Sequence, residues 1–148
     1  MGFEDVIDMM LSLLQDYNVY DDATLEELQI EAGVRMNMVI ARAQLSDLAF
    51  DTESNEFVRS ESTGLSVMEA TILAYGLLMM WLSHFVNNSE VLSTQLSSKE
   101  VTQFSNANRI QQGIALYKLA KTEFYQLVID YDALQTKSSI LKDLEGGN

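Results

Sequence analysis

Proline is absent from all 148 residues of the chain. Proline removes a backbone donor and breaks helix interiors, so a chain without it can form long helices joined at Gly, Asn and Ser. Cysteine is absent as well, which excludes disulfides, thiolate metal sites and a cysteine nucleophile. Apolar residues make up 47% of the chain, enough for a folded core. These features together indicate a mainly helical domain.

Apolar residues recur at helical spacing along most of the chain. The predicted helices cover Phe3–Gln15, Thr24–Asp47, Ser66–Val86, a short segment Ser89–Leu96, and Ala107–Leu134. Two of them begin with a capping box, in which a hydroxyl and a glutamate three residues later bond free backbone amides. These boxes are Thr24 with Glu27, and Ser66 with Glu69.

The second predicted helix carries a broad apolar stripe formed by Leu25, Leu28, Val34, Met38, Ile40, Ala41 and Leu45. Gly33 interrupts this helix and weakens it by about 1 kcal/mol relative to alanine. A close contact with another helix would explain that glycine.

Two short runs with aromatic residues, Leu48–Phe50 and Phe57–Arg59, flank a polar turn and predict a small β-hairpin. The expected fold class is therefore mainly α: a helical bundle with a small β-hairpin between the second and third helices. The bundle is expected to form one domain over residues 1–135.

The last predicted helix has a heptad-like seam of Ile110, Ile114, Tyr117, Phe124, Val128 and Tyr131, with Lys121 in one slot. Residues 136–148 do not continue this seam and are expected to form a C-terminal arm. Ile140, Leu141 and Leu144 could anchor this arm on a neighbouring molecule, although a frayed terminus is an equal alternative.

Negative charge is concentrated in the N-terminal part of the chain. Residues 1–61 carry fourteen acidic residues and three arginines, a net charge of −11, whereas residues 62–148 carry eight acidic and six basic residues, a net of −2. An acidic surface repels nucleic acid phosphates. It could face a basic protein, line a path along which DNA must slide, or serve only as a solvated surface.

No pattern typical of a catalytic or metal site is present, and we expect neither an enzyme nor a cofactor. The single histidine, His84, lies in an apolar helix, and the sequence has no Gly-x-Ser-x-Gly elbow and no phosphate-binding glycine loop. The segment Asp51–Asn55 begins like a calcium loop, but Glu56 and Ser62 occupy the positions that need glycine and glutamate. The uncharged run from Ala70 to Val86 is shorter than the roughly 20 residues of a membrane span, so a buried helix is expected there.

Several segments in a fixed order carry a resemblance to a known family: ILAYG (72–76), WL (81–82), NNSE (87–90), TQFSNAN (102–108) and DY (130–131). Together they resemble the small head–tail connector proteins, also called neck or adaptor proteins, of tailed bacteriophages. The resemblance covers roughly residues 45–134.

The resemblance implies a structural protein of the virion neck that is assembled in the host cytoplasm. Such proteins are helical bundles with a small hairpin, and they form a ring, usually twelve-fold, below the portal protein. The ring extends the DNA channel, binds the next neck or tail protein and lets genomic DNA pass. It implies no enzymatic activity and no membrane.

Two groups of residues are candidates for these roles. Contacts with other subunits are expected at Gln103, Phe104, Asn108, Ile140, Leu141 and Leu144. Residues facing a DNA channel are expected among Asp21, Asp22, Glu26 and Glu27. The alternative function is an acidic regulatory protein, such as a DNA mimic or an inhibitor of a basic partner.

Overall fold

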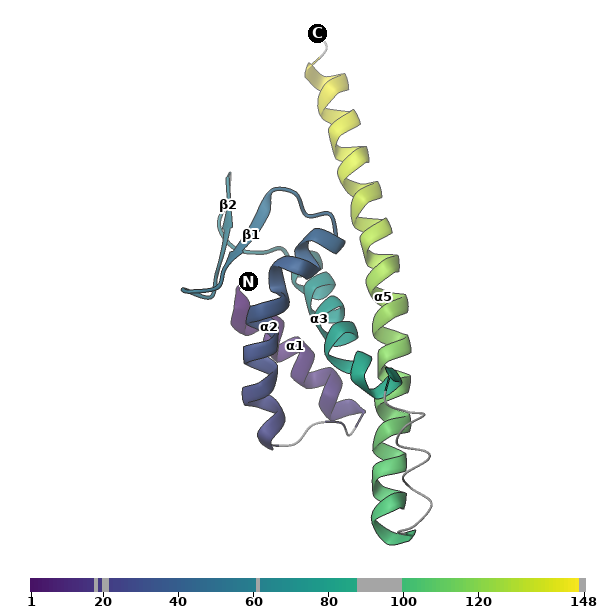
Figure 1. The fold of residues 1–148 in the computed structure, drawn as a ribbon. Helices are drawn as coiled ribbons and strands as arrows, with labels where there is room; N and C mark the ends of the chain where they lie inside the picture. Colours follow the sequence, from purple (N-terminus) through teal and green to yellow (C-terminus); the bar gives the residue numbers. More distant parts are fainter. Residues whose placement is uncertain (18, 20–21, 61, 88–99, 147–148) are drawn as a thin grey trace.

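The computed structural model describes residues 1–148 except 18, 20–21, 61, 88–99 and 147–148. The described part contains helices α1 (Phe3–Asp16), α2 (Asp22–Arg42), α3 (Val67–Asn87) and α5 (Glu100–Gly146), with strands β1 (Leu48–Asp51) and β2 (Glu56–Arg59) between α2 and α3. Figure 1 shows α1, α2 and α3 gathered beside α5, which continues past the hairpin to the C-terminus. The predicted class, a helical bundle with one hairpin, is confirmed. The predicted short helix 89–96 lies outside the described residues.

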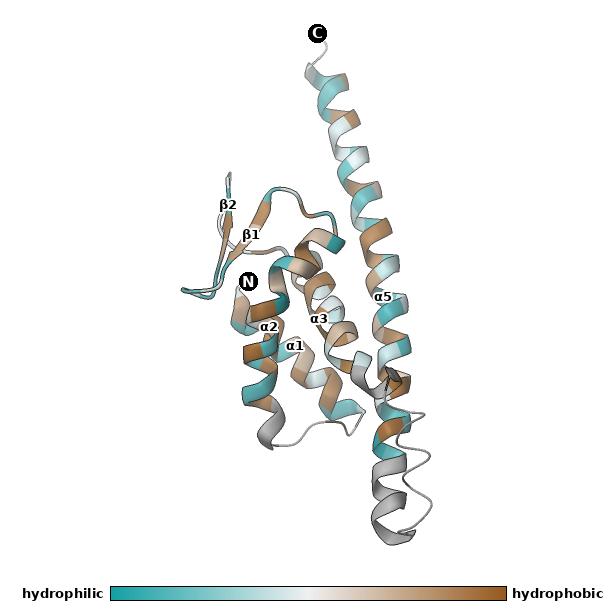
Figure 2. Ribbon diagram, in the orientation of Figure 1, coloured by the Kyte–Doolittle hydropathy of each residue, from teal (hydrophilic) through white to brown (hydrophobic). Residues whose placement is uncertain are grey.

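Helix α3 is the central element of the core, as its apolar sequence predicts. Ile72, Leu73, Leu78 and Leu82 are fully buried, and α3 packs against α1, α2 and α5. In Figure 2 α3 is coloured largely as hydrophobic, whereas α5 alternates between hydrophilic and hydrophobic positions. Among the described residues no helix has the length and hydropathy that crossing a bilayer requires.

The capping box predicted at Ser66 is confirmed at the start of α3. The Ser66 hydroxyl accepts a hydrogen bond from the Glu69 amide at 3.1 Å, and the Glu69 carboxylate accepts one from the Ser66 amide at 2.9 Å. The box predicted at Thr24 does not mark a helix start, because α2 already begins at Asp22.

Helix α2 ends at Arg42 rather than at the predicted Asp47. Gln44 adopts the left-handed conformation (φ 59°), and the Leu45 amide bonds back to the Ile40 carbonyl at 3.2 Å. This is the hydrogen-bond pattern of a Schellman end, which usually has glycine at the left-handed position. The sequence has glutamine there, so the usual stop signal is missing.

The predicted hairpin is present, and its register pairs Leu48 with Arg59 and Phe50 with Phe57. Two contacts of Phe50 fix β1 to the bundle. The Asn37 side chain on α2 donates to the Phe50 carbonyl and accepts from its amide, both at 2.9 Å, and so replaces a neighbouring strand for β1. The Phe50 ring stacks on Phe3 of α1 at 5.4 Å between centroids and contacts Phe57 at 5.0 Å. An isolated hairpin is marginally stable, and these contacts supply what it lacks.

Helix α5 differs most from its prediction. It begins at Glu100 instead of the predicted Ala107, and it runs through Gly146 instead of ending at Leu134. Its most buried positions are Leu116, Ala120 and Phe124, at i, i+4, i+8 spacing, while five members of the predicted seam lie at the edge of the contact. Phe124 alone is both in the predicted seam and fully buried.

Gly76 marks the point where three helices meet. A Cβ atom added to Gly76 of α3 would collide with the Val39 side chain of α2 and lie 2.8 Å from the Phe124 ring of α5. Only a glycine allows this approach. Gly33 is different, because an added Cβ there would meet only the Asn55 side chain at 3.8 Å, an ordinary contact. The close helix contact expected at Gly33 is therefore wrong.

These two glycines give a matched stability test. We expect Gly76→Ala to destabilise the fold by about 1–3 kcal/mol, because the new methyl group overpacks the core. Gly33→Ala should instead stabilise it by up to about 1 kcal/mol through helix propensity. Urea denaturation followed by circular dichroism measures both, and equal effects of the two substitutions would contradict the packing described.

Candidate functional site

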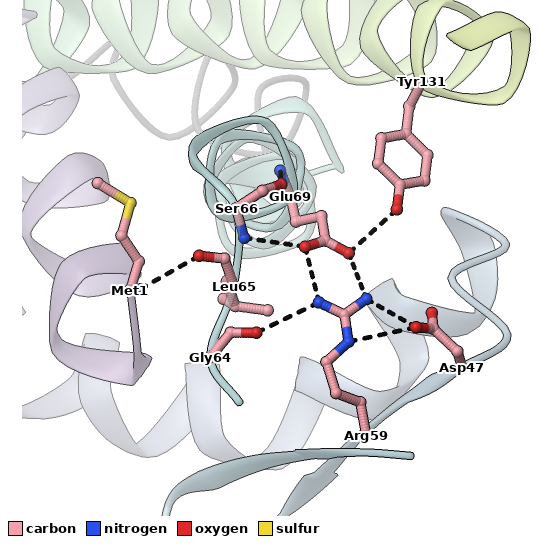
Figure 3. A network of polar contacts seen from close by, with 8 residues as sticks. All are labelled: Met1, Asp47, Arg59, Gly64, Leu65, Ser66, Glu69 and Tyr131. Carbon is pink, nitrogen blue, oxygen red and sulfur yellow. Dashed lines mark hydrogen bonds and ion pairs between the residues drawn. The ribbon is translucent and has the colours of Figure 1, made fainter. Parts of the chain in front are cut away.

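A network of hydrogen bonds and ion pairs surrounds the guanidinium of Arg59, the last residue of β2. Arg59 Nη1 and Nη2 donate to the two carboxylate oxygens of Glu69 at 2.9 and 2.7 Å, a bidentate pair. Nε and Nη2 also donate to Asp47 at 3.2 and 2.8 Å, and Nη1 donates to the Gly64 carbonyl at 3.2 Å. Figure 3 shows these bonds converging from the hairpin and its flanking loops on the first turn of α3.

Glu69 is the acceptor at the centre of this polar cluster. Only 2% of it is exposed, and it is the one buried charged residue among those the structure describes. Besides Arg59, its carboxylate accepts bonds from the Ser66 amide and from the Tyr131 hydroxyl of α5 at 3.1 Å. A buried carboxylate needs such partners, since burying a lone charge costs several kcal/mol. The cluster thus joins the hairpin, α3 and α5.

Burial and hydrogen bonding act in opposite directions on these groups. Burial raises the pKa of the Glu69 carboxyl, but the bonds from Arg59 and the Ser66 amide overcome it and lower that pKa to about 2. The Glu69 hydrogen bond raises the pKa of Arg59 against the effect of burial. Burial and the nearby Glu69 carboxylate raise the pKa of the Tyr131 hydroxyl. The carboxylate and the guanidinium are both charged at neutral pH.

A surface cavity of about 680 Å³ lies beside this cluster, bordered by Asp47, Arg59, Glu69, Tyr131 and Asp132 among others. A guanidinium has five N–H donors. The five bonds to Asp47, Gly64 and Glu69 use all of them. Arg59 therefore has no donor left for an anionic ligand, and the cluster acts as a structural clamp.

Among the described residues, no three His, Asp or Glu side chains are grouped so that they could hold a metal ion. In the hairpin turn, Asp51 accepts hydrogen bonds from the Glu53 and Ser54 amides at 2.9 and 3.4 Å, which lower its pKa. These bonds shape the turn. The side chain of His84 lies outside the described residues.

Besides these polar groups, the surface carries apolar side chains that are exposed to solvent. On α2 they are Ile30, Val34 and Met38, which are 60%, 73% and 49% exposed. They recur every four residues and lie on the side opposite the buried Leu28 and Ala32, since each residue turns a helix by roughly 100°. The broad stripe predicted for α2 is thus two stripes, one in the core and one exposed. We call Ile30, Val34 and Met38 the α2 stripe.

Helix α5 carries a second exposed set. From Asp132 to Gly146, a length of roughly 22 Å, every residue is exposed, so no described part of the chain covers the helix there. Ile129, Ile140 and Leu144 are more than half exposed. Ile129 and Ile140 lie on the side roughly opposite Leu116 and Phe124, and Leu144 lies within about 60° of Ile129 and Ile140 around the helix. Together with Ala133 and Lys137, these residues form an exposed stripe along α5. Figure 1 shows this part of α5 leaving the bundle.

The predicted contact residues divide between these surfaces. Ile140, Leu141 and Leu144 are exposed on the helical arm, and Asn108 is exposed far from them on α5. Gln103 and Phe104 lie in the first turns of α5, but their side chains are outside the described residues. The structure therefore does not bring the predicted contact residues together into one patch.

The acidic candidates are less fully described. Glu26 and Glu27 are exposed near the start of α2. Asp22 begins that helix, but its side chain and the whole of Asp21 lie outside the described residues. Sequence reasoning missed the Arg59 cluster and the α2 stripe. The one sequence signal for the Arg59 cluster was the capping box at Ser66, because it places Glu69 at the start of an apolar helix.

Comparisons with known proteins identify no relative: no family model, no curated protein and no solved structure matches the chain.

The depressed pKa of Glu69 predicts a pH-dependent stability. Because the folded pKa of about 2 lies below the usual value of 4.5, the clamp stabilises the fold above pH 4.5 and loses that effect as the pH falls towards 2. The difference between these two pKa values corresponds to about 3 kcal/mol. Glu69→Gln should therefore destabilise the protein at pH 7, and the difference from wild type should shrink by pH 2.5.

Denaturant midpoints of both proteins between pH 7 and 2.5 measure this. Glu53→Gln, at the exposed turn of the hairpin, is the matched control and should stay within about 0.5 kcal/mol of wild type at neutral pH. A Glu69→Gln protein as stable as wild type at pH 7 would refute the clamp.

Proposed function

We propose that the chain is a structural assembly protein, and that its assembly is the head–tail connector of a tailed bacteriophage. The observation that supports the assembly role is the end of α5 from Asp132 to Gly146, where every residue is exposed and no described part of the chain covers the helix. A single helix of this length is marginally stable in water, and its exposed Ile140, Leu141 and Leu144 gain by burial against a partner.

Two further features support the connector in particular. The chain has the helical bundle and the hairpin after α2 that the resemblance to connector proteins implies. The resemblance also implies a terminal segment that docks on an adjoining ring, and the exposed arm supplies one. In this proposal copies of the chain form a ring, with the twelve-fold number usual for the family, below the portal protein and above the next neck or tail protein.

The uneven charge fits a protein through which DNA slides. Net charge is −11 over residues 1–61 and −2 over the rest. In a ring whose acidic side faces the channel, the carboxylates would repel DNA phosphates and keep the genome from adhering. Asp21, Asp22, Glu26 and Glu27 are the proposed channel residues.

The arm gives a direct test of the assembly role. A chain truncated after Leu134 keeps the whole contact between α5 and the bundle and should fold, but it should no longer join the portal ring. Circular dichroism checks the fold, and negative-stain imaging of the chain mixed with its portal checks docking. A truncated protein that still joins the portal would exclude the arm from this role.

The acidic residues give an independent test. Reversing Asp21, Asp22 and Glu26 to lysine together should impair DNA passage or retention while rings still form. Phage infectivity and imaging of the particles measure the two effects separately. Unchanged infectivity would exclude the channel role, and tight binding of the unassembled chain to a basic nuclease or repressor would favour the regulatory alternative.

A further inference from the structure

The α2 stripe borders a groove that the fold itself leaves unfilled. This groove, about 580 Å³ in volume, lies between α2 and the turn of the hairpin and is lined in part by Ile30, Gly33, Val34 and Asn55. Gly33 leaves its floor without a side chain, although the backbone there is helical and nothing within the chain approaches closer than 3.8 Å to an added Cβ. Core packing therefore does not require the glycine.

A glycine that weakens its helix without a packing reason points to a function at the surface. With Ile30 60% and Val34 73% exposed at its rim, the groove presents apolar side chains around a gap into which a partner side chain can insert. What fits such a groove is the apolar face of a helix, which presents side chains every three to four residues.

The exposed part of α5 has the matching pattern. Glu27, Ile30 and Val34 on α2 are spaced at i, i+3 and i+7, and so are Lys137, Ile140 and Leu144 on the arm. Laid side by side in the same direction, the two helices place Lys137 against Glu27 and the two arm aliphatics against Ile30 and Val34. Opposite charges and apolar side chains thus meet in one register.

The arm cannot make this contact within its own chain. Helix α5 is continuous from Glu100 to Gly146, and it carries the arm away from the bundle, past the hairpin (Figure 1). Among the residues that the structure describes, none covers the α2 stripe or the arm. Two different surfaces that fit each other across copies form a heterologous contact, which closes into a ring or grows into a filament according to the angle between copies.

We propose that the arm of one copy docks on the α2 stripe and Gly33 groove of a second copy through Lys137, Ile140 and Leu144. Leu141, about 100° around the helix from Ile140, then remains exposed for the adjoining ring. This deepens the assembly role proposed above and rests on it, because copies of the chain must meet. It also assigns Glu27 to the contact between copies rather than to the DNA channel, and leaves Glu26 among the channel candidates.

Introduced cysteines test the contact directly, since the chain has none of its own. Full-length Ile30→Cys, carrying a size tag, is mixed with Ile140→Cys and oxidised mildly; a disulfide forms only when the two Cβ atoms come within about 4.5 Å. We expect at least about ten times more tagged–untagged dimer than with Ser138→Cys, which is exposed on the opposite side of the arm. Equal yields, or mainly Ile30–Ile30 dimers, would overturn the proposal.

A charge exchange tests the register without disulfides. Glu27→Lys and Lys137→Glu should each lower the cross-linking yield of the Ile30–Ile140 pair about five-fold, and the two together should restore it. A double variant as impaired as the single ones would overturn the pairing. If Glu27 faced the channel instead, Lys137→Glu would not compensate for Glu27→Lys.

The outcome is separable from the connector role. Rings that form with the portal but contain no Ile30–Ile140 disulfide after oxidation would refute this contact and leave the connector standing. A strong disulfide in a protein that never binds a portal would support the contact and refute the connector.

Discussion

The arrangement of this molecule depends on one buried ion pair. Arg59 and Glu69 meet with two hydrogen bonds, and the partners around them come from the loop after α2, the loop before α3, and α5. Each charge is acceptable inside the protein only because the other is present, since removing one partner of a buried pair is strongly destabilising. The hairpin is therefore held in place by its end as well as by the Phe50 stack and Asn37.

How far the sequence predicts the fold can be seen element by element. The start of α3 was readable because its signal is local: Ser66 and Glu69 are three residues apart and precede an apolar run. The hairpin was readable for the same reason. The end of α2 was missed because Gln44 occupies a left-handed position that glycine usually fills. The extent of α5 was missed because its apolar positions change face near Leu134, which resembles the end of a helix.

The polar cluster was beyond sequence reasoning because its members are distant along the chain. Tyr131 lies 62 residues from Glu69, and nothing local in either segment indicates that they meet. The exposed stripe on α2 was missed for another reason. A helix with apolar residues on two faces reads as one broad buried stripe, and only the position of the core decides which face remains outside.

The lysines are distributed as unevenly as the acids. All five occur after position 98, and Lys137 and Lys142 lie on the arm, where every side chain is exposed. Reagents that acylate lysine side chains will therefore find no lysine before position 99, and trypsin can cut that part of the chain only at arginine. The reactivity of these two lysines therefore reports whether the arm is exposed. Loss of tryptic cleavage or of acylation at Lys137 and Lys142 shows that a partner has covered it.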